Sequence, residues 1–237
     1  MARRIPENRF DELVDAATEV FIARGYRLTQ MSDIAEAVGV AKGTLYGYVE
    51  SKDALFLLCL VHADRTEPLE HPAQLPVRKP RSGELAALIK QRVSGQSIPP
   101  ALSAALGRER AEDPRAELES VVREFYQTLE RYCRGIKLMD RCSDHPEFGR
   151  TWQTEGREAP RAALVRYLEM RMQAGQLRGV ANVRLAARMI IEVVTTWAIH
   201  IKWDRSPEDF DPDEARENAI DFLVSALAIV PGAVSAG

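Results

Sequence analysis

The sequence predicts an all-helical protein in which a small N-terminal domain precedes a larger C-terminal domain. Apolar residues recur at three- and four-residue spacing along nearly the whole chain, and no segment alternates apolar and polar residues as a half-buried strand would. The chain has 237 residues, of which 46% are hydrophobic and 28% are charged, so it can bury a sizeable core. We therefore expect helices packed against helices throughout.

The first predicted helix carries an apolar stripe that ends at Gly25, because glycine readily adopts the left-handed conformation that ends helices. The stripe consists of Phe10, Leu13, Val14, Ala17, Val20 and Phe21. A short second helix is predicted over about 31–38, and Gly39 supplies the turn into a third. A longer helix followed by two short ones joined by a glycine-containing turn is a helix-turn-helix arrangement.

The third predicted helix has glycine at every fourth position, Gly39, Gly43 and Gly47, although each interior glycine weakens a helix by about 1 kcal/mol relative to alanine. On a helical projection, Leu45 and Val49 share the inward face, and Gly43 and Gly47 lie about 160° from Leu45. Burial cannot explain glycines on the outward face. Close approach of the backbone to another surface explains them.

Four interpretations of this glycine strip compete. A phosphate loop is disfavoured because GxxxxGK[ST] and GxGxxG are absent and no strand precedes the segment, and a membrane helix crossing is disfavoured by its length and polarity. A plain surface helix stays open. Insertion into the major groove of DNA fits better, since Lys42 and Lys52 can neutralise phosphates. Thr44, Tyr46 and Tyr48 can contact sugar, phosphate or a thymine methyl group.

Further along the chain, Ser51 is placed to cap a fourth helix. Residues 66–83 are predicted to be a loop or linker, because they hold four prolines and few large apolar residues. Asp113 and Pro114 then open a long helix that is expected to run to about Ile136. The predicted domains are residues 1–52, the helix-turn-helix unit, and residues 53–237, the larger helical domain.

The last two predicted helices indicate a dimer. Between Leu185 and Ile201 the charged residues are Arg188 and Glu192, and apolar residues surround the helix, so it must be buried on nearly all sides. Asp211 is expected to cap the final helix. The face that these helices leave uncovered most simply pairs with a second copy, although burial within one chain is the alternative. The expected interface residues are Ile190, Val194, Ile201, Leu223 and Leu227.

The run from Phe21 to Leu55, FIARGYRLTQMSDIAEAVGVAKGTLYGYVESKDAL, resembles the DNA-binding domain of the tetracycline-repressor (TetR) family. The shared pattern is aromatic-x-x-x-Gly-Tyr, a Thr-led second helix with Asp-Ile-Ala, then Gly-Val, Lys-Gly-Thr-Leu-Tyr and Ser-Lys. The resemblance implies a homodimeric transcriptional regulator, usually a repressor, with a palindromic double-stranded DNA operator. It also implies that the larger domain binds a small-molecule effector and that the last two helices build the dimer.

The resemblance also implies which residues contact DNA. Phosphate contacts fall on Thr44, Tyr46, Tyr48 and Lys52, base-reading positions on Ser32, Lys42 and Gly43, and Thr29 and Gln30 complete the set at the start of the second helix.

This chain departs from the family pattern at several of these positions. Gln30 stands where a second threonine is common, and Ala41 where serine or threonine often caps the recognition helix, a loss of about 1 kcal/mol. Ser32 replaces an arginine often used on bases, and Gly47 replaces an aromatic residue or histidine.

Direct base readout is therefore expected to be thin. We expect Arg3 and Arg4, on an N-terminal arm, to compensate at phosphates or in the minor groove.

Large apolar and aromatic side chains could line an effector pocket between the long helix and the penultimate one. The candidates are Phe125, Leu129, Tyr132, Met139, Trp152, Met189 and Trp197. A hydrophobic or aromatic effector is expected, and ordinary core packing is the alternative for each residue taken singly.

Catalysis, cofactors and metals are not expected. The four histidines have no metal-ligand spacing, no GxSxG motif is present, and the three cysteines match no zinc or disulfide framework. The rival class is a helical carrier or scaffold that has lost DNA binding, because residues 1–52 carry seven Arg or Lys against eight Asp or Glu, a net charge of −1. No run of eighteen apolar residues and no secretory signal core is found, so a cytoplasmic protein without a membrane partner is expected.

Overall fold

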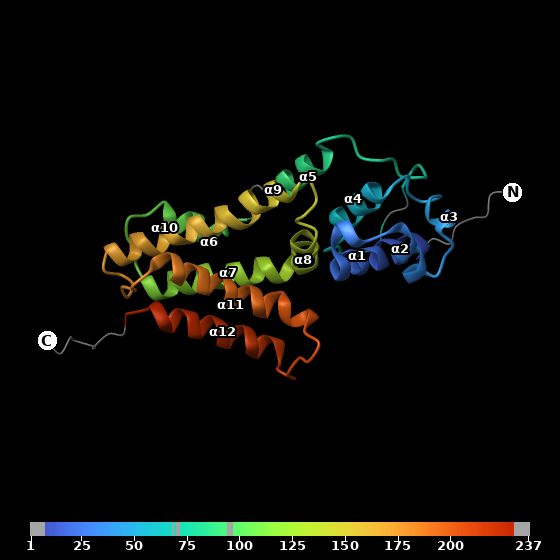
Figure 1. Cartoon of the computed structure of the whole chain (residues 1–237). Coiled ribbons are helices and arrows are strands. Elements are labelled where there is room, and N and C mark those ends of the chain that lie inside the picture. Colours follow the sequence, from blue (N-terminus) through green and yellow to red (C-terminus); the bar gives the residue numbers. More distant parts are fainter. Residues whose placement is uncertain (1–7, 68, 70–71, 94–96, 230–237) are drawn as a thin grey trace. The chain divides into compact units, whose positions relative to one another are not determined.

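The computed structural model describes residues 8–67, 69, 72–93 and 97–229 (Figure 1). Within these ranges the chain forms helices and no β-sheet, which confirms the predicted all-helical class. The chain forms two compact units. The first contains residues 1–93 and 132–154, and the second contains residues 94–131 and 155–237. The predicted domain division after Lys52 stays a prediction, and the compact units have other bounds.

The first unit is built around α1, against which α2, α4 and α8 pack. Its helices are α1 (Asn8–Leu28), α2 (Met31–Val38), α3 (Lys42–Leu45), α4 (Lys52–His62), α5 (Glu84–Val93), α8 (Cys133–Arg141) and α9 (Gly149–Thr151), followed by a π-helical turn (Trp152–Glu158) that enters the second unit. The predicted stripe of α1 forms the core of this unit: Phe10, Leu13, Val14, Ala17 and Phe21 are buried, and Val20 is half-buried.

Gly25 interrupts α1 without ending it. Its φ of 76° and ψ of 167° lie outside the helical region, yet the helix resumes after it and continues to Leu28. The expected helix end is therefore a kink. A Cβ atom at Gly25 would lie 2.9 Å from the carbonyl oxygen of Arg141, so both the conformation and the close approach of α8 require glycine here.

The long helix predicted from Pro114 to Ile136 is wrong in one respect, because it breaks at Tyr132. α7 ends one residue before Tyr132 and α8 begins one residue after it. The backbone N–H of Gly135 in α8 donates to Asp64 Oδ1, just beyond α4, at 2.9 Å. Tertiary contacts of this kind compete with helix continuation, and local periodicity does not detect them.

The second unit is a helical bundle in which α7 packs against α6, α11 and α12, and α10 packs against α6 and α11. Figure 1 shows α7, α10, α11 and α12 running alongside one another. The bounds are α6 (Pro100–Leu106), α7 (Pro114–Arg131), α10 (Ala159–Gln173), α11 (Val183–Ala198), a 3-10 turn (His200–Trp203) and α12 (Pro212–Leu227). The predicted cap of the last helix is confirmed, since the Asp211 carboxylate accepts the N–H groups of Asp213 and Glu214.

A buried arginine organises one end of this bundle. Arg171 of α10 is fully buried, and its guanidinium donates to both carboxylate oxygens of Glu117, at 2.7 and 3.2 Å. It also donates to the carbonyl oxygens of Ala105, Arg108 and Glu109 at 2.8 to 3.2 Å. Because these donors all find acceptors, burial of the charge is compensated, and the connection between α6 and α7 is fixed to α10.

No helix among the described residues is long and apolar enough to cross a membrane. The same residues contain no group of three or more His, Cys, Asp and Glu side chains that could hold a metal ion. Cys59 and Cys142 are buried free thiols, and burial raises the pKa of each to about 12, which keeps them protonated and unreactive near pH 7.

Candidate DNA-binding surface and effector domain

The connection from α1 to α2 is fixed by side chains that hydrogen-bond to the backbone. Thr29 is buried, and its Oγ1 donates to the Gly25 carbonyl oxygen at 2.7 Å. The Asp33 carboxylate accepts the Gln30 N–H at 2.8 Å and pairs with Arg24, and the first of these contacts is the larger reason why the pKa of Asp33 is lowered. Thr29 therefore fixes the entry into α2, and Gln30 remains exposed beside it.

The turn between α2 and α3 has the predicted glycine geometry. Gly39 has φ 70° and ψ 38°, and its N–H donates to the Glu36 carbonyl oxygen at 3.0 Å. The next N–H, of Val40, donates to the Ala35 carbonyl oxygen at 2.9 Å. These two bonds satisfy the carbonyls at the end of α2 and turn the chain sharply into α3.

The recognition helix is shorter than the sequence predicts. α3 ends at Leu45, and the N–H groups of Gly47 and Tyr48 donate to the carbonyl oxygens of Thr44 and Leu45 in a tighter turn. The side chain of Leu45 is fully buried. Gly43 faces open space: a Cβ atom there would meet nothing within 4 Å. The open glycine position expected from the projection is therefore present at Gly43, whereas Gly47 lies in the turn after the helix, where a Cβ atom would lie 3.1 Å from the Thr44 carbonyl oxygen.

Two of the expected phosphate-contacting residues are engaged inside the unit. Tyr48 is 3% exposed, and its ring stacks 6.3 Å from that of Phe10. The Lys52 Nζ donates to the carbonyl oxygens of Tyr26 and Thr29 at 2.9 and 3.0 Å, and lies 4.1 Å from the centroid of the Tyr26 ring. Both side chains hold the start of α4 against α1, so little of either is available to a ligand.

The remaining predicted DNA-binding residues divide into two groups. Gln30, Ser32, Lys42, Gly43, Thr44 and Tyr46 are exposed on the α2–α3 face. Arg3 and Arg4 lie outside the described residues, so the expected N-terminal arm stays a prediction.

Ser51 caps α4 as the sequence predicts, since its side chain accepts the N–H of Ala54 at 3.1 Å. Within the same turn, the Tyr26 hydroxyl donates to the Asp53 carboxylate. Burial and then this hydrogen bond raise the pKa of Tyr26 well above its usual value, so the phenol stays protonated. Hydrogen bonds between Tyr26 of α1 and Lys52 and Asp53 of α4 therefore hold together the two helices that precede and follow the α2–α3 segment in the chain.

Segment 132–154 contacts the helices that carry this face, a feature that the sequence reasoning missed. The Arg134 guanidinium pairs with Asp15 and Glu19 of α1 at 2.7 and 3.0 Å. The Arg141 guanidinium donates to the carbonyl oxygens of Ile22 and Ala23 at 2.9 and 3.0 Å. α8 therefore contacts α1 from its middle, at Asp15, to Ala23, two residues before the Gly25 kink.

His145 sits within an aromatic cluster rather than apart from other groups. Its ring is 5% exposed and lies 4.3 Å from the ring of Tyr26, 5.7 Å from Phe56 and 5.1 Å from Phe148, measured between centroids. The Nδ1 atom accepts the Glu147 N–H at 3.2 Å. Burial lowers the pKa of His145, so the neutral ring is favoured. This cluster joins the loop after α8 to α1 and α4.

The residues expected to line an effector pocket do not gather in one unit. Met139 and Trp152 are buried in the first unit, where Trp152 Nε1 donates to Asp140 Oδ1 at 2.9 Å, and Tyr132 begins the same segment. In the second unit, Phe125 is buried, and Leu129 and Trp197 are half-buried. Met189 is 58% exposed on α11, so it cannot line an internal pocket between these helices. The effector site stays a prediction.

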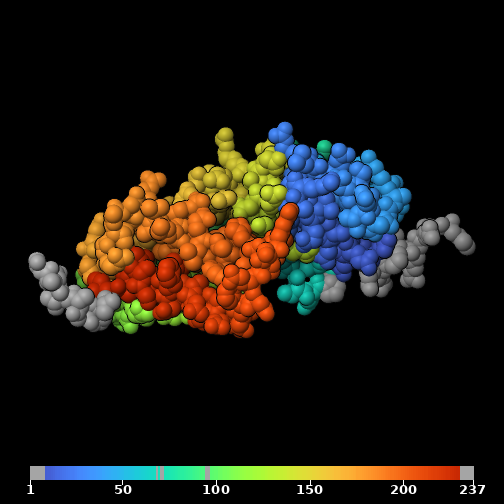
Figure 2. Space-filling view, turned by 60° about the horizontal axis from the view of Figure 1, so that its bottom comes forward, coloured from blue at the N-terminus to red at the C-terminus, as the bar shows by residue number. Residues whose placement is uncertain are grey.

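The residues expected at a dimer interface mostly face inward. Ile190, Val194, Leu223 and Leu227 are each at most 5% exposed within one chain, and Ile201 is half-buried. The large apolar side chains that α11 and α12 do expose are Leu185 at 52%, Met189 at 58% and Phe222 at 69%. Figure 2 shows α11 (orange) and α12 (red) forming adjoining parts of the surface. A second copy would therefore meet a different set of residues from the one expected.

Two family models match the chain. Residues 13–59 match "Bacterial regulatory proteins, tetR family". Residues 115–226 match "AefR-like transcriptional repressor, C-terminal domain". The second match includes α8 and the loop with His145, which pack within the first unit.

Among curated relatives, the chain is 25% identical over 225 residues to the "Fatty acid metabolism regulator protein" of Bacillus subtilis, covering 92% of this chain and 95% of the relative. It is 43% identical over 58 residues to the "HTH-type transcriptional activator FasR" of Mycolicibacterium smegmatis, covering 24% of this chain and 26% of the relative.

Solved structures share the fold. The ketosteroid transcriptional regulator KstR2 of Mycobacterium tuberculosis gives a TM-score of 0.58 at 16% identity, covering 96% of this chain and 98% of that chain. A probable transcriptional regulatory protein, RHA5900, gives a TM-score of 0.58 at 20% identity, covering 94% and 100%.

Proposed function

Because the chain belongs to the TetR family of transcriptional regulators, we propose that it acts as a homodimeric repressor that leaves a palindromic operator when a small hydrophobic effector binds. The observation that carries the proposal is the exposed α2–α3 face, where the backbone at Gly43 is bare and is flanked by Lys42 and Thr44. The family and fold are those of regulators rather than enzymes. Binding to a chromosomal operator requires the protein to work in the cytoplasm.

The α2–α3 face supports major-groove binding because its exposed groups suit DNA. Lys42 can neutralise a phosphate, and the Thr44 and Tyr46 hydroxyls can bond sugar or phosphate oxygens. Gly43 lets the helix approach base edges without a side chain between them. We retain Ser32 as the residue of α2 that reads a base, since it is exposed on this face.

Dimer formation through α11 and α12 is supported by their exposed apolar side chains. Leu185, Met189 and Phe222 are each more than half exposed. Large exposed apolar groups on neighbouring helices mark an interaction site, and a two-fold axis would let the same face cover itself. Two recognition helices related by that axis would read a palindrome.

The expected effector is hydrophobic, and fatty acids are the class to test first. This choice rests on the name of the Bacillus subtilis relative, whose similarity extends over nearly its whole length. Release would follow a population shift in which the effector changes the position of α8, and the contacts of Arg134 and Arg141 with α1 change the separation of the two α3 helices. A preference of about 3 kcal/mol for the released state lowers operator affinity about a hundredfold.

Selection of bound fragments from genomic DNA tests the proposal. The wild-type protein should enrich a few fragments that share a palindrome, and Gly43→Glu should enrich none, because a carboxylate would enter the groove beside phosphates. Gly179→Glu is the matched control, since a Cβ atom at Gly179 also meets nothing within 4 Å and the glycine lies in the second unit. Equal enrichment by wild type and Gly43→Glu would contradict the proposal. Effector binding without any enriched fragment would favour a carrier instead.

A further inference from the structure

The connection between α4 and α5 returns to the end of the recognition segment. The N–H of Val77 donates to the Tyr48 carbonyl oxygen at 2.8 Å, and the N–H of Glu50 donates to the Val77 carbonyl oxygen at 2.9 Å. These bonds form a parallel bridge between Val49 and Val77. A segment that the sequence predicts as a loop is thus attached to the three residues that follow the exposed α3 face.

Two further contacts hold the residues after Val77. The N–H of Lys79 donates to the Glu50 carboxylate at 2.8 Å. The Arg78 guanidinium forms two bonds to the Glu84 carboxylate, at 2.7 and 2.9 Å, and the N–H of Arg81 donates to the same carboxylate at 2.8 Å. The backbone of residues 78–81, here called the basic segment, therefore has a fixed place in the first unit.

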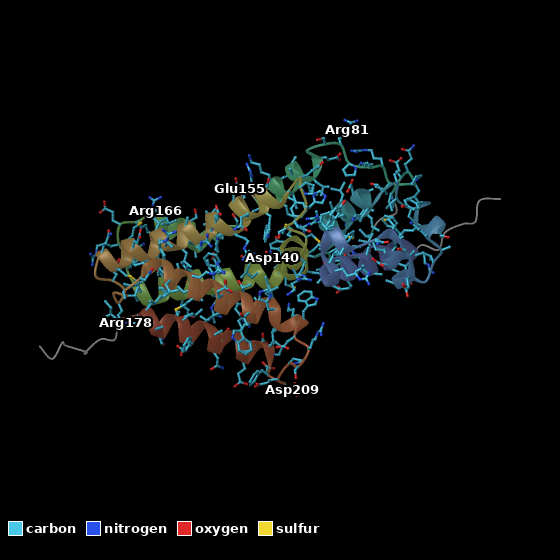
Figure 3. All side chains as sticks on the ribbon, viewed as in Figure 1. Arg81, Asp140, Glu155, Arg166, Arg178 and Asp209 are labelled. Atoms are coloured by element: carbon cyan, nitrogen blue, oxygen red, sulfur yellow. The ribbon has the colours of Figure 1, made fainter. Side chains whose placement is uncertain are left out.

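The basic segment presents two cations with little or no internal pairing. The Lys79 side chain is 65% exposed, and its Nζ lies 3.7 Å from Asp53 Oδ2, a loose contact. Arg81 is exposed, and its guanidinium has no hydrogen bond among the described residues, although its charge helps to lower the pKa of Glu84. Figure 3 shows Arg81 on the outer side of the connection between α4 and α5.

The net charge of the basic segment and its neighbouring carboxylates does not by itself favour a contact with DNA. The carboxylates of Glu50, Asp53 and Glu84 balance the three cations of the basic segment, and each carboxylate already accepts a hydrogen bond from another group. Attraction at long range is therefore weak. The segment can contribute because hydrogen bonds to Tyr48 and Glu50 hold its backbone next to the surface that we propose contacts DNA, which places its cations near the phosphates.

The exposed α3 face has only one cation of its own. Lys42 is the only cationic residue between Gly39 and Gly47, and the Lys52 ammonium is bonded to two carbonyl oxygens. A protein that binds DNA needs several phosphate contacts, since these supply most of its non-specific affinity. The basic segment adjoins this face and adds two exposed cations on a backbone that is held in place.

We infer that the basic segment is a second DNA-contacting element, in which Lys79 and Arg81 bind backbone phosphates flanking each operator half-site. The inference rests on the proposed function and extends it to the α4–α5 connection. Its contacts carry no sequence information, so they strengthen binding to every sequence and fix the register of α3 in the groove.

The test is the salt dependence of binding to a fragment recovered by the genomic selection. Each lost phosphate contact reduces the slope of log affinity against log salt by about 0.9. Lys79→Ala/Arg81→Ala should therefore reduce it by roughly 3 to 4 in a dimer, which carries two basic segments. Lys90→Ala/Arg166→Ala is the matched control, because both side chains are exposed and the change in charge is the same.

Shortening the DNA gives an independent reading. Removing the base pairs that flank the palindrome should reduce the salt slope of the wild-type protein to that of Lys79→Ala/Arg81→Ala. The salt slope of the double variant should stay the same on the shorter DNA. The attachment is tested by Val77→Pro, which removes the N–H bonded to Tyr48, against Val77→Ala, which keeps it. Only Val77→Pro should reduce the slope of log affinity against log salt.

A wild-type slope in Lys79→Ala/Arg81→Ala, together with loss of binding in Gly43→Glu, would overturn this inference alone. Intact binding in both variants would overturn the proposed function as well.

Discussion

At the scale of single residues, His145 links stability to pH. Burial lowers the pKa of its ring, and Lys52 acts in the same direction, while Asp53, Glu147 and Asp144 oppose it. A histidine whose folded pKa lies below the unfolded value, about 6.5, binds its proton more weakly in the folded state. Its contribution to stability is therefore complete above about pH 6.5 and is lost as the pH falls through the folded pKa.

Replacing His145 should remove this part of the pH dependence. Wild type should lose stability between pH 7.5 and pH 5.5, by up to about 1.4 kcal/mol per pH unit. His145→Phe should lose less over the same interval, as measured by urea unfolding. Burial also lowers the pKa of His62, but that residue is present in both proteins, so the difference isolates His145. Identical pH profiles for the two proteins would show that the ring is not desolvated in its aromatic cluster.

The sequence predicted which residue types the DNA-binding face contains, but not which side chains remain free. Lys42, Thr44 and Tyr46 are exposed as expected, because their places on the projection follow from local helical geometry. Tyr48 and Lys52 could not be judged in this way. Their partners, Phe10 and the carbonyl oxygen of Tyr26, lie far away in the sequence and come close only through folding.

At the scale of elements, the contact between α1 and α8 explains the kink at Gly25. The φ and ψ of Gly25 fall in a region essentially restricted to glycine, and a Cβ atom there would press on the Arg141 carbonyl oxygen at 2.9 Å. Gly39 offers a comparison. It also has a positive φ, but a Cβ atom there would meet nothing within 4 Å.

Gly25→Ala should therefore destabilise the protein more than Gly39→Ala. The second change costs about 1 to 2 kcal/mol of left-handed strain. The first should cost about 1 to 3 kcal/mol more, because the backbone is in a rarer region and α8 must shift. Chemical unfolding of the two full-length variants measures the difference. Equal losses would mean that α8 does not press on α1 at this point.

The helix bounds could be predicted from the sequence where a regular apolar period began at a recognisable capping residue. Ser51 and Asp211 cap helices as expected, since both signals are local. The break at Tyr132 could not be predicted, because the apolar period continues through it. The contact between Gly135 and Asp64 joins residues 71 positions apart, and no local pattern encodes it.

At the scale of the whole molecule, binding to a palindromic operator requires a dimer, which we propose is held by α11 and α12. The apolar positions on these helices form two faces, and the sequence alone does not say which face covers the chain's own core. Leu223 is 5% exposed and its neighbour Phe222 is 69% exposed, so one step along α12 separates the core from the proposed interface. A helical projection centred on Leu223 and Leu227 would have placed Phe222 off the inward face.

Phe222→Asp should weaken the dimer, because it puts a charge in the centre of the proposed apolar interface. Sedimentation velocity should show wild type as a dimer and the variant shifted towards monomer. Leu28→Asp is the control, since Leu28 is 75% exposed and lies in the first unit. A variant that remains fully dimeric would place the two-fold contact elsewhere.

The most direct measurement of the central claim is DNA cleavage from position 43. A Gly43→Cys protein that carries an iron chelate on the new thiol should cut a selected operator at two places related by a two-fold axis. Cys133 is replaced by serine in both labelled proteins because it is only half-buried, and the buried Cys59 and Cys142 should not take the label. A Gly179→Cys protein that carries the same label is the control. If the protein labelled at position 43 binds the DNA but cuts it no more strongly than this control, entry of α3 into the groove is contradicted.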